Sequence, residues 1–134
     1  LSLDFRSIQQ LKGYTMAASD ILDPETVEAL RAYERDGILT LAELTDIYLG
    51  DVTNRYTAIE QAIQTADSDS LQRAAHALKS AAANVGAFGM RDICQQLETL
   101  GKSGTAAGTE ILLKKLTTEI PRVENALKDL SNKT

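Results

Sequence analysis

The chain has 134 residues, of which 43 % are hydrophobic and 25 % charged, a composition that fits one globular domain and excludes wholesale disorder. Its net charge of −5 disfavours a nucleic-acid partner, and no apolar stretch approaches the roughly 18 residues of a membrane-spanning helix, so we expect no membrane insertion. The single cysteine, Cys94, excludes an internal disulfide and favours a reduced, cytoplasmic location.

The first part of the chain gives only a weak signal. Residues 1–22 are predicted to be an N-terminal extension or linker, in which positions 5–11 allow a short helix and the first residues need not be native. The main domain is expected over residues 23–134. Its first firm helix begins at Asp23-Pro24, where an aspartate caps the end and a proline fits the first helical position, and it stops near Asp36-Gly37.

Two helices follow. The second is long, with apolar residues three and four positions apart up to about Ala66. The residues of this stripe are Leu41, Leu44, Tyr48, Val52, Tyr56, Ile59 and Ile63. Turn and capping residues at 67–70 precede a third helix, which is predicted from about Ser70 to Asn84.

Glycines punctuate the rest of the chain. Gly86 and Gly89 are expected to separate the third helix from a fourth over Met90 to Leu100, which Gly101 would end. The last helix is predicted from Thr109 to Leu130. It contains Pro121, which should bend it near Thr117.

The fold class follows from this pattern. No segment alternates with period two, so we expect an all-α protein. Four substantial helices with short connections predict an antiparallel up-down four-helix bundle, with an additional short N-terminal helix packed across one end. The apolar stripes are sized for a single bundle, so a monomer is expected.

His76 is the only histidine. On a wheel of about 100° per residue it falls roughly 150° from the centre of the apolar arc, which places it on the solvent face. An exposed histidine with no special role is the ordinary alternative. Its neighbours argue for more, because Lys79 and Ser80 lie one turn after it and Arg73 one turn before it. Lys79 offers a counter-charge to a phosphoryl group, and Ser80 and Ala83 leave room for a partner.

The segment around this histidine is similar to a known signature. Residues 76–86, HALKSAAANVG, resemble the motif of the histidine phosphotransfer (Hpt) family. That motif has a histidine, any residue, leucine, lysine, a small residue, and a glycine six positions further on, here Gly86. The resemblance extends over about residues 24–130. Further similarities lie at residues 47–51, Ala75, Cys94, Leu97 and Glu98.

The resemblance implies roles for these residues. His76 would be phosphorylated through Nε2, and Lys79 would help to neutralise the phosphoryl group. Ser80 would keep clearance beside the imidazole, and Gly86 would end the helix.

Downstream, Glu98 would lie beside Arg91 and Gln95. It could accept a hydrogen bond from His76 Nδ1–H and so leave Nε2 free. An exposed Glu98 with no role stays an open alternative.

The function implied is that of a phosphocarrier. It would accept a phosphoryl group on His76 and exchange it with the aspartate of a response-regulator receiver domain in a multistep phosphorelay, downstream of a hybrid histidine kinase. The chain would need no cofactor or metal of its own, because the receiver would supply Mg²⁺. No ATP-binding glycine loop is visible in the sequence, so an enzyme with its own ATP site is not expected. The alternatives are a docking module that is not phosphorylated and a helical domain of a longer enzyme.

Overall fold

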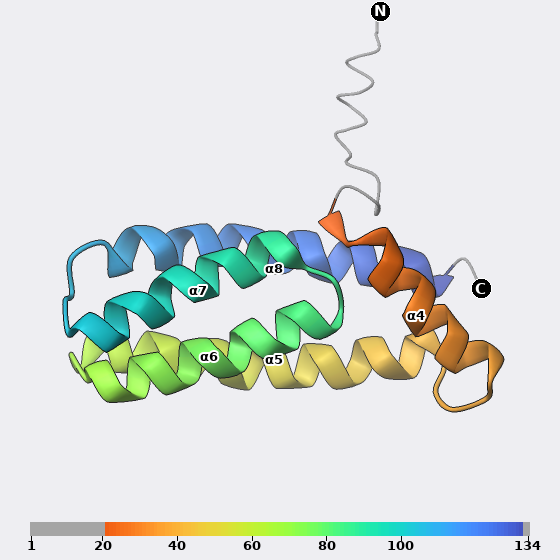
Figure 1. The fold of residues 1–134 in the computed structure, drawn as a ribbon, viewed down its shortest axis with the longest axis horizontal. Helices are drawn as coiled ribbons and strands as arrows, with labels where there is room; N and C mark the ends of the chain where they lie inside the picture. The colour runs from red at the N-terminus through yellow and green to blue at the C-terminus, as the bar shows by residue number, and fades with distance from the viewer. Residues whose placement is uncertain (1–20, 133–134) are drawn as a thin grey trace, which may run out of the picture.

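The computed structural model describes residues 21–132, and in this range the elements are all helices (Figure 1). They are α4 (Pro24–Arg35), α5 (Leu41–Gln64), α6 (Ser68–Asn84), α7 (Phe88–Ser103) and α8 (Thr109–Asn132). The expected all-α class is confirmed for this part of the chain. The short helix allowed at positions 5–11 lies outside the described residues.

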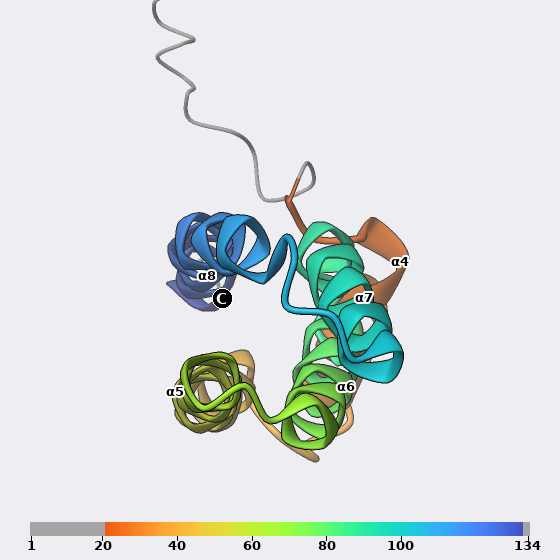
Figure 2. The ribbon, with the colours of Figure 1, turned by 90° about the vertical axis from the view of Figure 1, so that its left-hand side faces the viewer.

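The four long helices run side by side along the long axis of the molecule, each in the direction opposite to the one before it (Figure 1). Seen end-on, α5 and α8 lie on one side and α6 and α7 on the other (Figure 2). Contacts join α5 to α6, α6 to α7, α7 to α8 and α8 back to α5, and the α6–α7 pair packs most extensively. The shorter α4 crosses one end. Within residues 21–132, none of the helices combines the length and apolar character needed to span a bilayer.

The core lies between these helices. It is one cluster of buried apolar side chains, in which each large aliphatic member contributes about 1.5–3 kcal/mol when fully removed from water. The largest fully buried members are Leu22, Ile59, Leu78, Met90, Leu97, Leu116 and Val123. Leu22 thus packs in the core, although it precedes the predicted start of the domain at residue 23.

Side-chain caps fix the start of α4 and of α5. The Asp23 carboxylate accepts a hydrogen bond from the Thr26 backbone N–H at 3.0 Å, as expected for the residue before Pro24. At α5, Thr40 and Glu43 form a capping box, in which each side chain accepts from the other's backbone N–H at 3.0 and 2.9 Å. Both helices begin where these caps predict, and they also end close to their predicted limits.

The predicted start of α6 was too late. The helix begins at Ser68, because Asp67 is the capping residue and its carboxylate accepts from the Ser70 backbone N–H at 3.1 Å. Similarly, α7 begins at Phe88, so Gly89 lies inside this helix instead of before it. Glycine and serine near a helix start do not mark its first residue by themselves.

The prediction that Gly101 ends the fourth helix is wrong. The helix continues to Ser103 and ends at Gly104, whose φ of +72° gives the left-handed cap that favours glycine. Gly101 is instead a packing residue. A Cβ placed on it would lie 2.7 Å from the backbone nitrogen of Gln72 and 2.9 Å from its Cα. The absence of a side chain at this position therefore allows α6 and α7 to approach closely.

The turn between α6 and α7 also anchors α4. Gly86 has a φ of +78°, and a Cβ there would come within 2.9 Å of the Thr26 Cβ. The Gly86 carbonyl accepts a hydrogen bond from the Asp23 N–H at 2.8 Å. One glycine thus allows the left-handed turn and the close contact with the start of α4.

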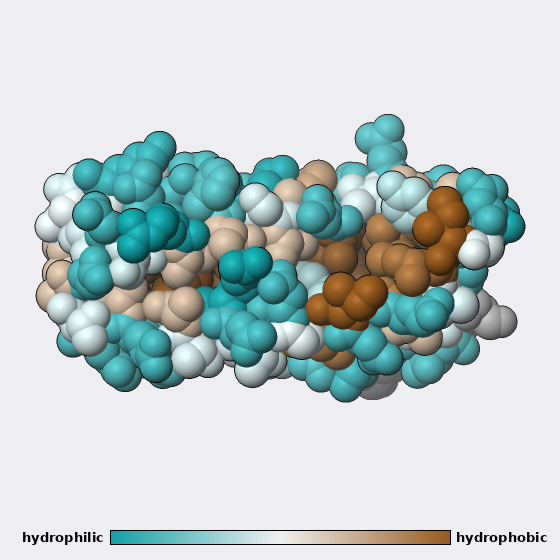
Figure 3. Space-filling model, turned by 90° about the horizontal axis from the view of Figure 1, so that it is seen from below, coloured by the Kyte–Doolittle hydropathy of each residue, from teal (hydrophilic) through white to brown (hydrophobic). Residues whose placement is uncertain are grey.

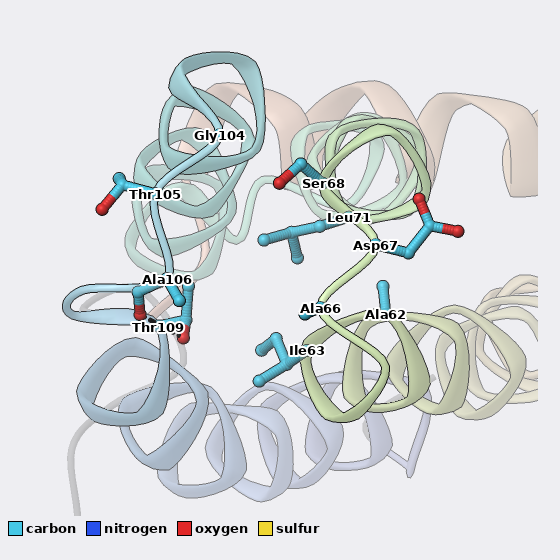
Figure 4. A pocket seen from close by; sticks show the side chains of 10 residues that line it. All are labelled: Ala62, Ile63, Ala66, Asp67, Ser68, Leu71, Gly104, Thr105, Ala106 and Thr109. Carbon is cyan, nitrogen blue, oxygen red and sulfur yellow. Dashed lines mark hydrogen bonds between the residues drawn. The ribbon is translucent and has the colours of Figure 1, made fainter.

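The opposite end of the molecule holds a small pocket between the α5–α6 turn and the α7–α8 loop (Figure 4). Its volume is about 80 Å³, far below the roughly 300 Å³ at which ligand pockets begin. Leu71 and Ile63 line it, and the Thr109 hydroxyl closes the loop by donating to the Ala106 carbonyl at 2.8 Å. The pocket at this end is therefore too small for a ligand of that size. From this end, α8 runs through Pro121 to Asn132.

Candidate functional site

His76 projects from the outer face of α6. The helix buries Leu71, Ala75, Leu78 and Ala82 on its inner face, and 60 % of the His76 side chain is exposed. The predicted position on the solvent face is confirmed. A protein partner can therefore reach the imidazole.

Glu98 of α7 lies directly beside this imidazole. Its Oε2 is 2.9 Å from His76 Nδ1, and its Oε1 accepts a hydrogen bond from Lys79 Nζ at 2.6 Å. Glu98 is only 5 % exposed, so the alternative of an exposed glutamate is wrong. One buried carboxylate thus joins the histidine and the lysine of α6.

The charge of Glu98 is stabilised by its partners. The hydrogen bond from Lys79 holds the pKa of Glu98 below its ordinary value, the bond to His76 acts in the same direction, and burial opposes both. Glu98 is therefore ionised at neutral pH. Because an ionised carboxylate can only accept, the hydrogen of the shared bond belongs to His76 Nδ1, which leaves Nε2 with a free electron pair in the neutral imidazole.

Lys79 bonds from α6 across to α7. Besides its bond to Glu98, its Nζ donates to the Gln95 Oε1 at 3.1 Å, and its side chain is 23 % exposed. Lys79 is one turn from His76 on α6, so its ammonium group stands close to the imidazole. The structure thus brings together His76, Lys79, Gln95 and Glu98.

The other predicted residues surround this group more loosely. Arg73 is exposed, and its Nη2 donates to the Ser70 hydroxyl at 3.3 Å. Ser80 is exposed one turn after His76, and Ala83 is half-buried one turn further. Gly86 lies beyond them in the α6–α7 turn, where it shapes the backbone.

Gly101 is the residue that the sequence interpretation missed. It lies one turn after Glu98 and sets the close approach of α7 to α6 through its contact with Gln72. A signal was present, because Gly101 is in phase with the apolar stripe through Cys94 and Leu97. A glycine on a buried stripe indicates close helix packing as readily as a helix end.

Comparisons with known proteins point to a family and to a similar fold. A family model described as Hpt domain matches residues 43–131. The structure resembles the crystal structure of histidine-containing phosphotransfer protein B (HptB) from Pseudomonas aeruginosa PAO1, with a TM-score of 0.77 and 23 % sequence identity. That likeness covers 85 % of this chain and 96 % of the other. No curated protein matches the chain in sequence.

Proposed function

The chain belongs to the Hpt domain family, and on this premise we propose that it accepts a phosphoryl group at Nε2 of His76 and exchanges it with the aspartate of a response-regulator receiver domain in a phosphorelay. The observation that carries the proposal is an exposed imidazole whose Nδ1 is bonded to a buried carboxylate. Its Nε2 is thereby free to act as a nucleophile, and the exposed side chain is accessible to a partner.

The chain's own residues supply positioning and charge, which are the main requirements of phosphoryl transfer. Glu98 orients the ring, and Lys79 is close enough to offer a positive charge to the arriving phosphoryl oxygens. Ser80 and Ala83, with small side chains beside the imidazole, give clearance to the receiver. The reacting aspartate and its Mg²⁺ belong to that partner.

We further propose that the chain is a carrier without an ATP site, served by an upstream hybrid histidine kinase. Its architecture is assigned as an antiparallel up-down four-helix bundle, α5–α8, with α4 as the additional short helix. The alternating directions of these helices and the ring of contacts among them support this assignment. We propose that the domain covers residues 23–134 together with Leu22, because Leu22 packs in the core.

The proposal is tested by phosphorylation of the purified chain. The wild type and His76→Gln are incubated with a panel of phosphorylated receiver domains and Mg²⁺, and an acid-labile, base-stable phosphate is sought by intact mass. We expect label on the wild type and none on His76→Gln. Absence of label from every receiver, with a native circular dichroism spectrum, would contradict the proposal.

A second candidate is a helical docking module that works without phosphorylation. It is favoured by an apolar hollow of about 550 Å³ between α4, α5 and the end of α6, bordered by exposed Tyr33 and Ile47. Figure 3 shows apolar residues gathered around this hollow, at the end of the molecule that carries α4. This candidate is supported if His76→Ala and His76→Gln both leave partner signalling intact.

A further inference from the structure

Glu98 is the one charged residue among the buried residues of the described chain. Holding the Nδ1 hydrogen of His76 does not require a charge, because a neutral amide oxygen also accepts from an N–H. A buried carboxylate costs free energy unless it is paired, and here Lys79 pairs it at 2.6 Å. Orientation of the ring alone thus explains neither the negative charge of Glu98 nor the lysine that balances it.

The chemistry of transfer supplies this role. When the Nε2 electron pair of His76 forms a bond to phosphorus, the bond from phosphorus to the receiver aspartate oxygen breaks, and its electron pair stays on that oxygen. The ring keeps its Nδ1 hydrogen and becomes a positively charged phosphoimidazolium. In the reverse step the pair of the N–P bond returns to Nε2. The group that leaves is neutral imidazole only if Nδ1 still holds its hydrogen; otherwise it is the far more basic imidazolate.

We propose that Glu98 is a positioning residue that acts through His76 Nδ1 to keep the phosphorylated ring protonated, and so keeps the phosphoryl group ready for transfer. This rests on the proposed function. In the unphosphorylated protein, Lys79 balances the charge of Glu98. A phosphoryl group on Nε2 draws the Lys79 ammonium to its oxygens, and the phosphoimidazolium then takes the place of Lys79 as the partner of Glu98.

The charges around the ring support this exchange. On α6, Lys79 is one turn after His76, and Arg73 and Asp69 lie one and two turns before it. The packed helix α7 faces the ring with Glu98 and the neutral Gln95.

Arg91 lies two turns before Glu98 on α7, where it bonds Asp92 at 3.1 Å and stacks on Phe88 at 4.1 Å. Glu98 is thus the negative group bonded to Nδ1. Asp92 is paired with Arg91 instead, and Asp69 lies two turns from His76.

The test labels wild type, Glu98→Gln, Lys79→Gln and the control Asp92→Asn with phosphoramidate, a small phosphoryl donor that needs no receiver. Hydrolysis of the phosphohistidine and the ¹⁵N shift of Nδ1 are then followed against pH. In Glu98→Gln we expect the midpoint of Nδ1 protonation to fall by about one pH unit or more, because an adjacent opposite charge shifts such equilibria by this amount. Hydrolysis and transfer to a receiver at neutral pH should then slow by about tenfold.

Lys79→Gln should shift the same midpoint upwards, because it removes a positive charge close to the ring, and that charge opposes protonation of Nδ1. Asp92→Asn removes an equal charge from the same helix and should leave the midpoint unchanged. Opposite shifts in Glu98→Gln and Lys79→Gln are not expected from a general loss of structure. An unchanged midpoint in Lys79→Gln, or in a labelled Glu98→Gln, overturns the inference while the phosphocarrier function stands. A wild type that takes label from phosphoramidate and exchanges it with no receiver contradicts the proposed function instead.

Discussion

Cys94 lies in the core, one turn before Glu98 on α7, and burial raises the pKa of its thiol to about 12. In the unfolded chain a thiol ionises from about pH 8.5. The folded state therefore has the full benefit of the neutral thiol below pH 8.5 and loses it as the pH rises towards 12. We expect the free energy of unfolding to fall over this range. Urea unfolding at several pH values measures it.

A matched variant separates this effect from other titrations. Cys94→Ala should be less stable at neutral pH, because it leaves a cavity, but its stability should depend less on alkaline pH. Burial also raises the pKa of Tyr48, so part of the alkaline loss should remain in the variant. An identical pH dependence in the two proteins would rule out Cys94 as a source of the effect.

The residues of the site were predictable to different degrees. The exposure of His76 follows from the helical wheel, because its position is far from the apolar arc of α6. The burial of Glu98 does not follow, because its own wheel places it at the boundary between core and solvent. At such a position the distance between neighbouring helices decides the exposure. That distance depends on contacts such as Gly101 with Gln72, which join residues far apart in the sequence.

At the scale of the helix, Gly101 is a position where α6 and α7 leave no room for a side chain. Gly101→Ala would place a Cβ against the Gln72 backbone, which cannot move as a side-chain end can. We expect a loss of about 1–3 kcal/mol in the free energy of unfolding, as for other overpacked positions. The displaced α7 should also weaken the bond between Glu98 and His76, so the phosphorylation of His76 from a receiver should slow.

Gly50→Ala is the natural control. Gly50 is also inside a long helix, α5, but a Cβ there would meet open space. Alanine is favoured over glycine in a helix by up to about 1 kcal/mol, so this variant should gain stability. Chemical denaturation of the two variants should show changes of opposite sign. An equal change in the free energy of unfolding of the two variants would mean that α6 and α7 can move apart at Gly101 without loss of stability.

The helices themselves were largely predictable, and their ends less so. The apolar stripe of α5 and the Asp23-Pro24 start of α4 are local features, which a single sequence displays. At Gly101, packing between helices outweighs the local preference of glycine for a helix end. The sequence predicts capping residues at 67–70 but does not single out Asp67, because Ser68, Asp69 and Ser70 have the same capping chemistry.

At the scale of the whole molecule, the class of fold follows from the four long stripes, and the place of α4 across one end was expected, but the contacts that attach α4 do not follow from the sequence. Its attachment depends on the Asp23 N–H bond to the Gly86 carbonyl and on the fit of Thr26 against Gly86. The two segments are remote in the sequence, and no periodicity links them. The same attachment makes α4 one wall of the apolar hollow, with Leu30 and Tyr33 facing residues of α5 and α6.

The apolar hollow is the surface through which two copies of the chain could associate, so it provides a test of the predicted monomer. The core is completed within one chain, and the net charge of −5 opposes association of identical copies. Against this, Ile47 lines the hollow and is more than half exposed. We expect a single monomeric species in sedimentation velocity over a wide range of concentrations, and the same for Ile47→Lys. A wild type that sediments faster as its concentration rises, beside an Ile47→Lys variant that does not, would show that the hollow joins two copies and that the monomer prediction is wrong.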